Sequence, residues 1–456
     1  MKTTFLKLFF IATTSFILQT ELKGQVTIGS EISPNDGALL DLKEYEPTKD
    51  TSTSNKGILL PRVKLTNLIP ATDEEFAASI GSTGDWNRKE HIGLLVYNVN
   101  EDLCRDGQSI YKKAYVWDGT EWKVLGSTEV LGPDVYRFTD SRDGQSYLAR
   151  NFGEAGDWML ENLAYVPNDS DPGFSGFKED PYTSLINKDS KLYGYPTPMD
   201  VIYTIGTIPD TWKKEYGILY SWHAATNDEN LSSAEQGQVD ATEVPGPNEV
   251  ETLFGKIRGI CPEGWHLPSD REWNKLEKQI YNNISDYSCN QATDVLTPSE
   301  WNPIWEWGTE STDGAGWRGS RTQVPLGWAM INAVAEGVPG HGNAMKLPTY
   351  PEGKVALITN QYVPEQKTYG RSISAVDGGF AVWLVGSLTG GVDTKPNSPL
   401  SFGYGGSVYF WTSSCRDSNQ SSYVWARLFS AATSAVYRDS LQLKGRLNPV
   451  RCVKDK

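Results

Sequence analysis

The chain contains few of the residues on which metal and redox chemistry depend. Its 456 residues include only four histidines and five cysteines. No two cysteines have the C-x-x-C spacing of zinc ribbons and dithiol redox motifs, and scarce histidine disfavours a histidine-rich metal centre. We therefore expect no bound cofactor and no metal, with calcium as the one weak exception.

The chain also lacks an excess of positive charge and long apolar runs. Lys and Arg total 42 against 57 Asp and Glu, which gives a net charge of −15. Such a chain is not attracted as a whole to phosphate backbones or anionic lipid, so we expect no nucleic-acid partner. No run reaches the roughly 20 apolar residues of a membrane-spanning helix, so we expect no transmembrane span.

Aromatic residues and glycine are abundant, whereas methionine is rare. There are 16 Trp, 22 Tyr and 43 Gly beside 5 Met. Wide aromatic side chains favour strands, and glycine favours turns. The length allows two or three domains. The composition therefore predicts a β-rich α+β protein with many loops.

Residues 1–24 have the layout of a secretory signal peptide. Lys2 and Lys7 precede an apolar stretch of 11 residues, which is too short for a membrane anchor. We expect cleavage before Gln25 and export to the cell surface, the periplasm or the medium. In an exported chain the cysteines are disulfide candidates, and an odd number leaves at least one without an intrachain partner.

Residues 25–130 predict a β-rich N-terminal segment with no catalytic constellation. Apolar runs on both sides of Asp118-Gly119 predict a hairpin with a two-residue turn. Other short runs predict strands at residues 26–28, 57–60 and 93–97.

A second unit begins near residue 131, and its clearest element is a helix. Ser269-Asp270-Arg271-Glu272 forms a capping box. Trp273, Leu276 and Ile280 then share one face, with Lys275, Glu277 and Lys278 elsewhere, so we expect a helix to residue 281 or 283. Residues 380–385 predict a strand buried on both faces. Short strands are predicted at residues 409–414, 423–429, 435–438 and 449–453.

Six segments occur in order in the second unit: Asp143-Gly144 and residues 158–163, 216–222, 261–269, 410–414 and 450–455. Taken together, they resemble the Fibrobacter succinogenes major paralogous domain (FISUMP) family over about residues 131–456. The resemblance implies an exported bacterial surface protein with a fold like that of C-type lectins and formylglycine-generating enzymes, and with an activity that is generally unassigned. Residues 25–130 resemble the β-rich segment that often precedes this domain.

A lectin-like fold brings a cysteine before the helix close to one in the last strand, which implies a Cys261–Cys452 disulfide. It would close a loop of about 190 residues, worth about 5 kcal/mol in the chain-entropy model. A bond between Cys289 and Cys415 is a second possibility. The pairing of Cys104, Cys289 and Cys415 stays open, because sequence does not fix connectivity.

We expect no catalytic residues. Ser413, Ser414 and Cys415 could act as nucleophiles, but the histidines available as bases, His223, His266 and His341, lie in no triad motif. Cys415 and Cys452 are too far apart in sequence for the cysteine pair of formylglycine-generating enzymes. For calcium, the oxygen-rich residues 227–230 and Asp313 are the weak candidates.

Four tryptophans in a loop-rich region are candidates to face a ligand: Trp301, Trp305, Trp307 and Trp317. We expect an adhesion or binding protein that recognises a glycan or a surface protein through the loops between Trp301 and Ser407. The alternatives are an enzyme of the formylglycine-generating group with a diverged site, and a purely structural surface component. The ligand and the oligomeric state stay open.

Overall fold

The structure is a computed structural model in which the chain forms two compact units, residues 1–62 with 95–97 and residues 63–94 with 98–456. The expected signal peptide lies outside the described residues. None of the helices in the described part has the length and apolar character needed to cross a membrane. The described residues are 26–46, 52–84, 86–104, 109–126, 129–168, 171–181, 190–198, 203–229, 256–289, 300–302, 305, 316–319, 324–331, 372–389, 400–415, 423–430 and 433–456.

The first unit contains a two-stranded parallel sheet, β1 (Val26–Ile28) and β2 (Leu40–Leu42). Val26 lies opposite Leu40, and Ile28 lies opposite Leu42. Because side chains alternate along a strand, these four residues share one face. They are 38–57% exposed. The predicted strand at residues 57–60 is wrong: Ile58 and Leu59 are exposed and outside any strand.

Strands β3 (Arg62–Val63), β4 (Leu95–Asn98), β5 (Ala114–Trp117) and β6 (Trp122–Val124) and helix α2 (Asp73–Ser79) follow. The Phe76 ring of α2 packs against the rings of Trp117 and Trp122, with centroids 4.6 and 5.6 Å away. The predicted hairpin is present, but Trp117 pairs with Trp122, so its loop has four residues rather than two. Asp118 closes this loop by accepting hydrogen bonds from the backbone of Thr120 and Glu121.

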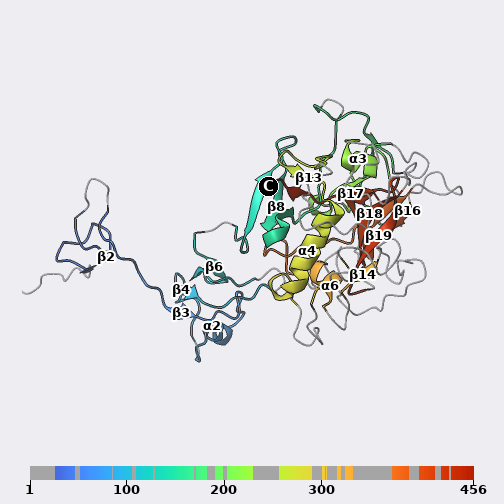
Figure 1. The fold of residues 1–456 in the computed structure, drawn as a ribbon. Coiled ribbons are helices and arrows are strands. Elements are labelled where there is room, and N and C mark those ends of the chain that lie inside the picture. Colours follow the sequence, from blue (N-terminus) through green and yellow to red (C-terminus); the bar gives the residue numbers. More distant parts are fainter. Residues whose placement is uncertain are drawn as a thin grey trace, which may run out of the picture. The chain divides into compact units, whose positions relative to one another are not determined.

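Three larger sheets form much of the second unit (Figure 1). In two of them, strands from the chain end, β20 and β21, join strands from earlier in the chain. Their orders are β13 (Trp265–His266), β21 (Val453–Lys454), β9 (Asp157–Met159), β8 (Ser146–Asn151), β7 (Val135–Thr139); then β10 (Lys178–Glu179), β11 (Leu192–Gly194), β12 (Leu219–Tyr220), β20 (Asn448–Pro449); and β14 (Gly316–Arg318), β19 (Val436–Leu443), β18 (Tyr423–Ser430), β17 (Ser407–Cys415). The same unit also contains a short pair of strands, β15 (Ser387–Thr389) and β16 (Leu400–Phe402), and the short helices α3 (Trp222–Thr226) and α6 (Leu326–Met330).

Helix α4 (Asp270–Asn282) confirms the sequence prediction, including its capping box. The Ser269 hydroxyl accepts from the Glu272 backbone at 3.3 Å, and the Glu272 carboxylate accepts from the Ser269 backbone at 2.8 Å. Trp273, Leu276 and Ile280 are fully buried, as expected. Glu277 was expected on the outer side, but it is also fully buried, because it pairs with arginines of the neighbouring sheet.

Residues 380–385 are buried, as predicted, except for the half-buried Trp383, but they do not form a strand. One isolated bridge joins Val382 to Ile331. Ala381 has φ +47°, a left-handed conformation that interrupts extended structure. The carbonyls of Phe380 and Ala381 accept hydrogen bonds from Arg451 instead of from a neighbouring strand.

Candidate functional site

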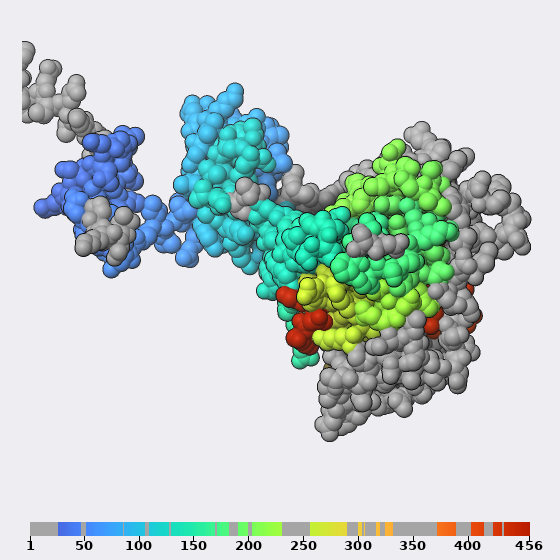
Figure 2. All heavy atoms as spheres, turned by 90° about the horizontal axis from the view of Figure 1, so that it is seen from above, coloured from blue at the N-terminus to red at the C-terminus, as the bar shows by residue number. Residues whose placement is uncertain are grey.

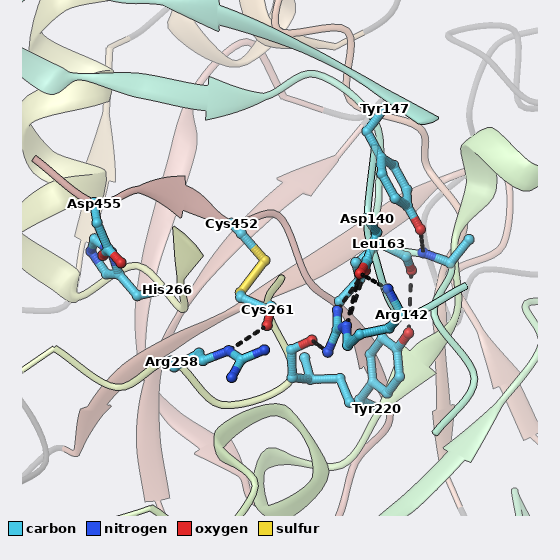
Figure 3. Close-up of a disulfide and its surroundings, with 12 residues drawn as sticks. Asp140, Arg142, Tyr147, Leu163, Tyr220, Arg258, Cys261, His266, Cys452 and Asp455 are labelled. Carbon is cyan, nitrogen blue, oxygen red and sulfur yellow. Dashed lines mark hydrogen bonds and ion pairs between the residues drawn. A yellow bond between two sulfur atoms is a disulfide. The ribbon is translucent and has the colours of Figure 1, made fainter. Parts of the chain in front are cut away.

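Several segments that carry the family resemblance lie around the Cys261–Cys452 disulfide, where Figure 3 shows Leu163, Tyr220, His266 and Asp455. The two Cα atoms are 5.9 Å apart, and both residues are fully buried. The predicted pairing is therefore confirmed. The bond joins the segment before α4 to the end of the chain, which also pairs with β9 and β13.

Arg451, beside this disulfide, satisfies backbone groups that the irregular segment at residues 380–381 would otherwise leave unpaired. Its guanidinium donates to both carbonyls of that segment and to the Asn162 side chain, 2.9 Å away. Asn162 in turn donates to the Tyr216 carbonyl. A Cβ at Gly217 would lie 2.5 Å from the Asn162 side chain, so only glycine fits there. These family residues therefore hold the core together.

Arg142 performs a similar role beside the Asp143-Gly144 turn. It makes a bidentate ion pair with the buried Asp140 and donates to the carbonyl of Ile260 at 2.9 Å. Its guanidinium also lies over the Tyr165 ring, 3.7 Å from the centroid. Figure 3 shows this pair on the opposite side of the disulfide from His266.

His266 is held between two carboxylates. Its Nδ1 lies 2.6 Å from Asp455, its Nε2 lies 2.7 Å from Glu272, and the side chain is 3% exposed. Burial opposes ionisation of Glu272, but the interactions with His266 and the hydrogen bonds from Ser269 together outweigh it and lower the pKa of Glu272. In Figure 2 the chain end, in red, lies at the surface beside the yellow segment containing β13 and the start of α4. Both ring nitrogens are engaged, which fits a positioning role for this histidine.

The second disulfide joins Cys104 to Cys289, with Cα atoms 5.4 Å apart. The suggested bond between Cys289 and Cys415 is therefore wrong, because the chain brings residue 104 to the end of the segment after α4. The Cys415 side chain lies outside the described residues. Cys104 is exposed and Cys289 is half-buried, in contrast to the other disulfide.

Asp377 reinforces the contact made by Cys104–Cys289. It accepts hydrogen bonds from Tyr111 at 2.5 Å and from Ser109 at 2.8 Å. Burial and then the bond to Asp377 raise the pKa of Tyr111. Gly132 donates to the Val376 carbonyl, and a Cβ there would collide with the Asp377 backbone. Residues 104–132 are thus fastened to residues 289 and 376–377 by covalent and polar contacts.

A buried charged cluster lies between helix α4 and the inner face of the β14–β19–β18–β17 sheet. The sheet supplies Arg318, Arg427 and Arg438, and α4 supplies Asp270 and Glu277. All five side chains are at most 2% exposed. Arg427 lies 2.6 Å from Asp270 and also pairs with Glu277, and Arg438 binds both oxygens of Asp270. Burial opposes ionisation of Asp270, but the two guanidiniums outweigh it and hold the pKa of Asp270 well below its usual value. This cluster joins α4 to the sheet.

The outer face of the same sheet carries a row of ring-bearing and apolar side chains, which we call the outer row: Trp317, Tyr437, Leu428 and Tyr409. The strand register places them directly opposite one another across all four strands. Trp317 is 47% exposed, and its ring lies 4.7 Å from that of Tyr437. The other three are half-buried. Trp317 is the most exposed of the candidate tryptophans that the structure describes.

The remaining candidate tryptophans lie elsewhere. Trp301 is 6% exposed and packs edge-on against Trp305, so it belongs to the core and not to the surface. Trp305 is partly buried against the core and contacts the Tyr281 ring. Trp307 lies outside the described residues, as does most of the loop region from residue 303 to residue 399. Sequence reasoning missed Tyr437 and Tyr409, although both lie in predicted strands, where successive side chains face opposite sides of the sheet.

No group of three or more His, Cys, Asp or Glu side chains suited to a metal occurs in the described part of the chain. Of the weak calcium candidates, Asp313 and Asn230 lie outside that part. Asp228 pairs with His223 at 2.7 Å and with Lys191 at 3.2 Å. Lys191 also donates to the side-chain oxygen of Asn227. The ammonium group of Lys191 therefore already binds the Asp228 and Asn227 oxygens that a calcium ion would need.

The family comparison agrees with the resemblance seen in the sequence. The Fibrobacter succinogenes major domain model matches residues 154–454, about two thirds of the chain, so the protein belongs to this family. Residues 27–136 are similar to the phage tail like trimerisation region. No curated protein and no solved structure matches the chain.

Proposed function

We propose that this is an exported protein that assembles as a homotrimer through its N-terminal segment and uses a lectin-like C-terminal domain to bind a glycan or a surface protein. Membership of the Fibrobacter succinogenes major domain family and the match to a trimerisation region support this reading. Two disulfides suit an oxidising compartment outside the cytoplasm.

The observation that carries the trimer is the apolar face of β1 and β2. Val26, Ile28, Leu40 and Leu42 are on this face and are 38–57% exposed. A two-stranded sheet is only marginally stable alone, so this face requires a cover. Fourteen of the nineteen large exposed apolar side chains in the described part lie between residues 26 and 125. Identical copies of the segment would bury them, as expected for an oligomerisation surface.

The described catalytic candidates favour binding over turnover. His266 has both ring nitrogens on carboxylates. The Ser414 hydroxyl is fully buried and accepts from the Asp270 backbone. Neither arrangement presents a serine to a free base, which nucleophilic catalysis requires.

The trimer is tested by light scattering on the full exported chain. The native protein should have three times the mass of one chain. Ile28→Asp and Leu40→Asp should each yield monomers, because a carboxylate in a buried contact is strongly unfavourable. Ile208→Asp is the matched control, since Ile208 is 55% exposed in the C-terminal unit. A monomeric native protein, or trimers that tolerate both N-terminal aspartates, would exclude this mode of assembly.

A further inference from the structure

The outer row carries an inference that deepens the proposed function and depends on it. We propose that the row Trp317–Tyr437–Leu428–Tyr409 is a stacking platform for an uncharged polysaccharide chain. Three properties of the row support this ligand class: its geometry, its exposure and its charge.

The geometry of the row suits an extended ligand. Its four members lie on four neighbouring strands, in register. Three inter-strand spacings of about 4.8 Å place its ends roughly 14 Å apart. A platform of that length contacts several consecutive rings of a chain better than one small molecule. Trp317 is on β14, at the end of the sheet order, where the ring is reached from solvent.

The row mixes ring faces with polar groups, as sugar recognition requires. Tilted aromatic rings such as Trp317 and Tyr437 offer flat apolar faces to the C–H surfaces of sugar rings. Asp439, two residues from Tyr437, and Arg446, whose charge acts on Tyr409, supply an acceptor and donors for hydroxyl groups. A protein partner with an apolar anchor would not need this pair of charges beside the rings.

Charge selects the class of polysaccharide. Asp439 and Arg446 are of opposite sign and both act on Tyr409. One charge of each sign therefore acts on the row, while the whole chain has a net charge of −15. Long-range repulsion therefore disfavours acidic polysaccharides, and nothing in the row compensates for it. A neutral chain has no such penalty.

The same sheet shows why the two faces have different roles. The inner face is filled by the charged cluster and α4, and its side chains are buried. On the outer face, Trp317 is 47% exposed. Replacement of Trp317 therefore removes a half-exposed ring from an edge strand and leaves the packing of α4 intact.

Native affinity electrophoresis of the full chain tests the proposal, with starch, xylan, mannan or laminarin in the gel and polygalacturonate as the acidic comparison. We expect at least one neutral polysaccharide to retard the protein and polygalacturonate not to do so. Trp317→Ala should weaken that binding about five- to ten-fold, as expected for one aromatic contact. Trp317→Phe should retain most of it, and Ile208→Ala, an exposed apolar control, should match the native protein.

Folding is checked by the mass of the assembly and by circular dichroism of each variant. Equal retardation of native protein and a folded Trp317→Ala variant would overturn the outer row as the site, while leaving ligand binding in place. Retardation by polygalacturonate alone, or by none of these polymers, would overturn the neutral-polysaccharide inference. The proposed function is tested separately: the mass of the assembly tests the trimer, and capture of a protein ligand by the native chain tests ligand binding.

Discussion

At the scale of single residues, the most demanding feature is the charged cluster beneath α4. Arg427 and Arg438 are directly opposite one another on neighbouring strands, a pairing that is unfavourable for like charges. Asp270 lies between them and binds both. Asn274 adds a further acceptor, 2.9 Å from Arg427. The cluster is stable only while its carboxylates are present.

Asp270→Asn should destabilise the C-terminal domain by about 3–5 kcal/mol, because it leaves two buried guanidiniums without their carboxylate. The free energy of unfolding from denaturant titration measures this. Glu129→Gln is the control: it removes one partner of the exposed Arg137–Glu129 pair and should cost less than about 1 kcal/mol. A similar small loss in both variants would contradict the central role of Asp270.

The same carboxylate should make stability depend on pH. The charges of Arg427 and Arg438 hold the pKa of Asp270 in the folded protein below its value in the unfolded chain, about 3.9. Its stabilising contribution is therefore complete above that unfolded value and is lost as the pH falls toward the folded one.

Unfolding free energies measured from pH 6 down to pH 2 test this dependence. The difference between the native protein and Asp270→Asn should be largest near neutral pH and should shrink below about pH 4. A difference that stays constant over that range would mean that Asp270 does not ionise differently in the two states.

At the scale of elements, the sequence predicted those helices and strands that depend on interactions between residues close together in the chain. The capping box and the spacing of Trp273, Leu276 and Ile280 predicted α4, because both depend on residues within one helix. The strands β17, β18 and β19 were also predicted, since each contains a short apolar run rich in aromatic and β-branched residues. The predicted two-residue turn of the hairpin at Asp118 was wrong. The loop has four residues, because the Asp118 side chain accepts hydrogen bonds that close this longer loop.

Features set by distant partners could not be predicted. Glu277 is a charged residue of the kind that usually faces solvent on a helix. It is buried because it pairs with Arg318 and Arg427, which lie on strands far along the chain. Residues 380–385 have a strand-like sequence, but the carbonyls of Phe380 and Ala381 accept hydrogen bonds from Arg451 and not from a neighbouring strand. The Cys261–Cys452 bond was predicted only through the family resemblance. The outer row needed the register of four strands, which no single segment specifies.

At the scale of the whole molecule, the Cys104–Cys289 bond links two regions that match different family models. Cys104 belongs to the region similar to the trimerisation model, and Cys289 belongs to the Fibrobacter succinogenes major domain. Tyr111 and Ser109 add hydrogen bonds to Asp377 at the same contact. In the proposed trimer, this contact would join the assembling region to the C-terminal domain.

The two disulfides should differ in their sensitivity to reductant. Exchange requires a thiolate to reach a sulfur, and Cys104 is exposed whereas Cys261 and Cys452 are fully buried. Mild dithiothreitol on the native protein should therefore open Cys104–Cys289 first. Alkylation followed by peptide mass analysis should find label on Cys104 and Cys289, and on Cys261 and Cys452 only after denaturation.

Opening the Cys104–Cys289 bond should weaken the contact around Asp377 but leave the proposed trimer assembled. The reason is that Cys104 and Cys289 are not part of the apolar face of β1 and β2. A loop of 185 residues is worth about 5 kcal/mol in the chain-entropy model. The midpoint of chemical unfolding should fall while the mass of the assembly stays at three chains. Cys104→Ser with Cys289→Ser, which needs no reductant, should reproduce both results. Equal labelling of all four cysteines in the native protein would contradict the difference in burial on which this expectation depends.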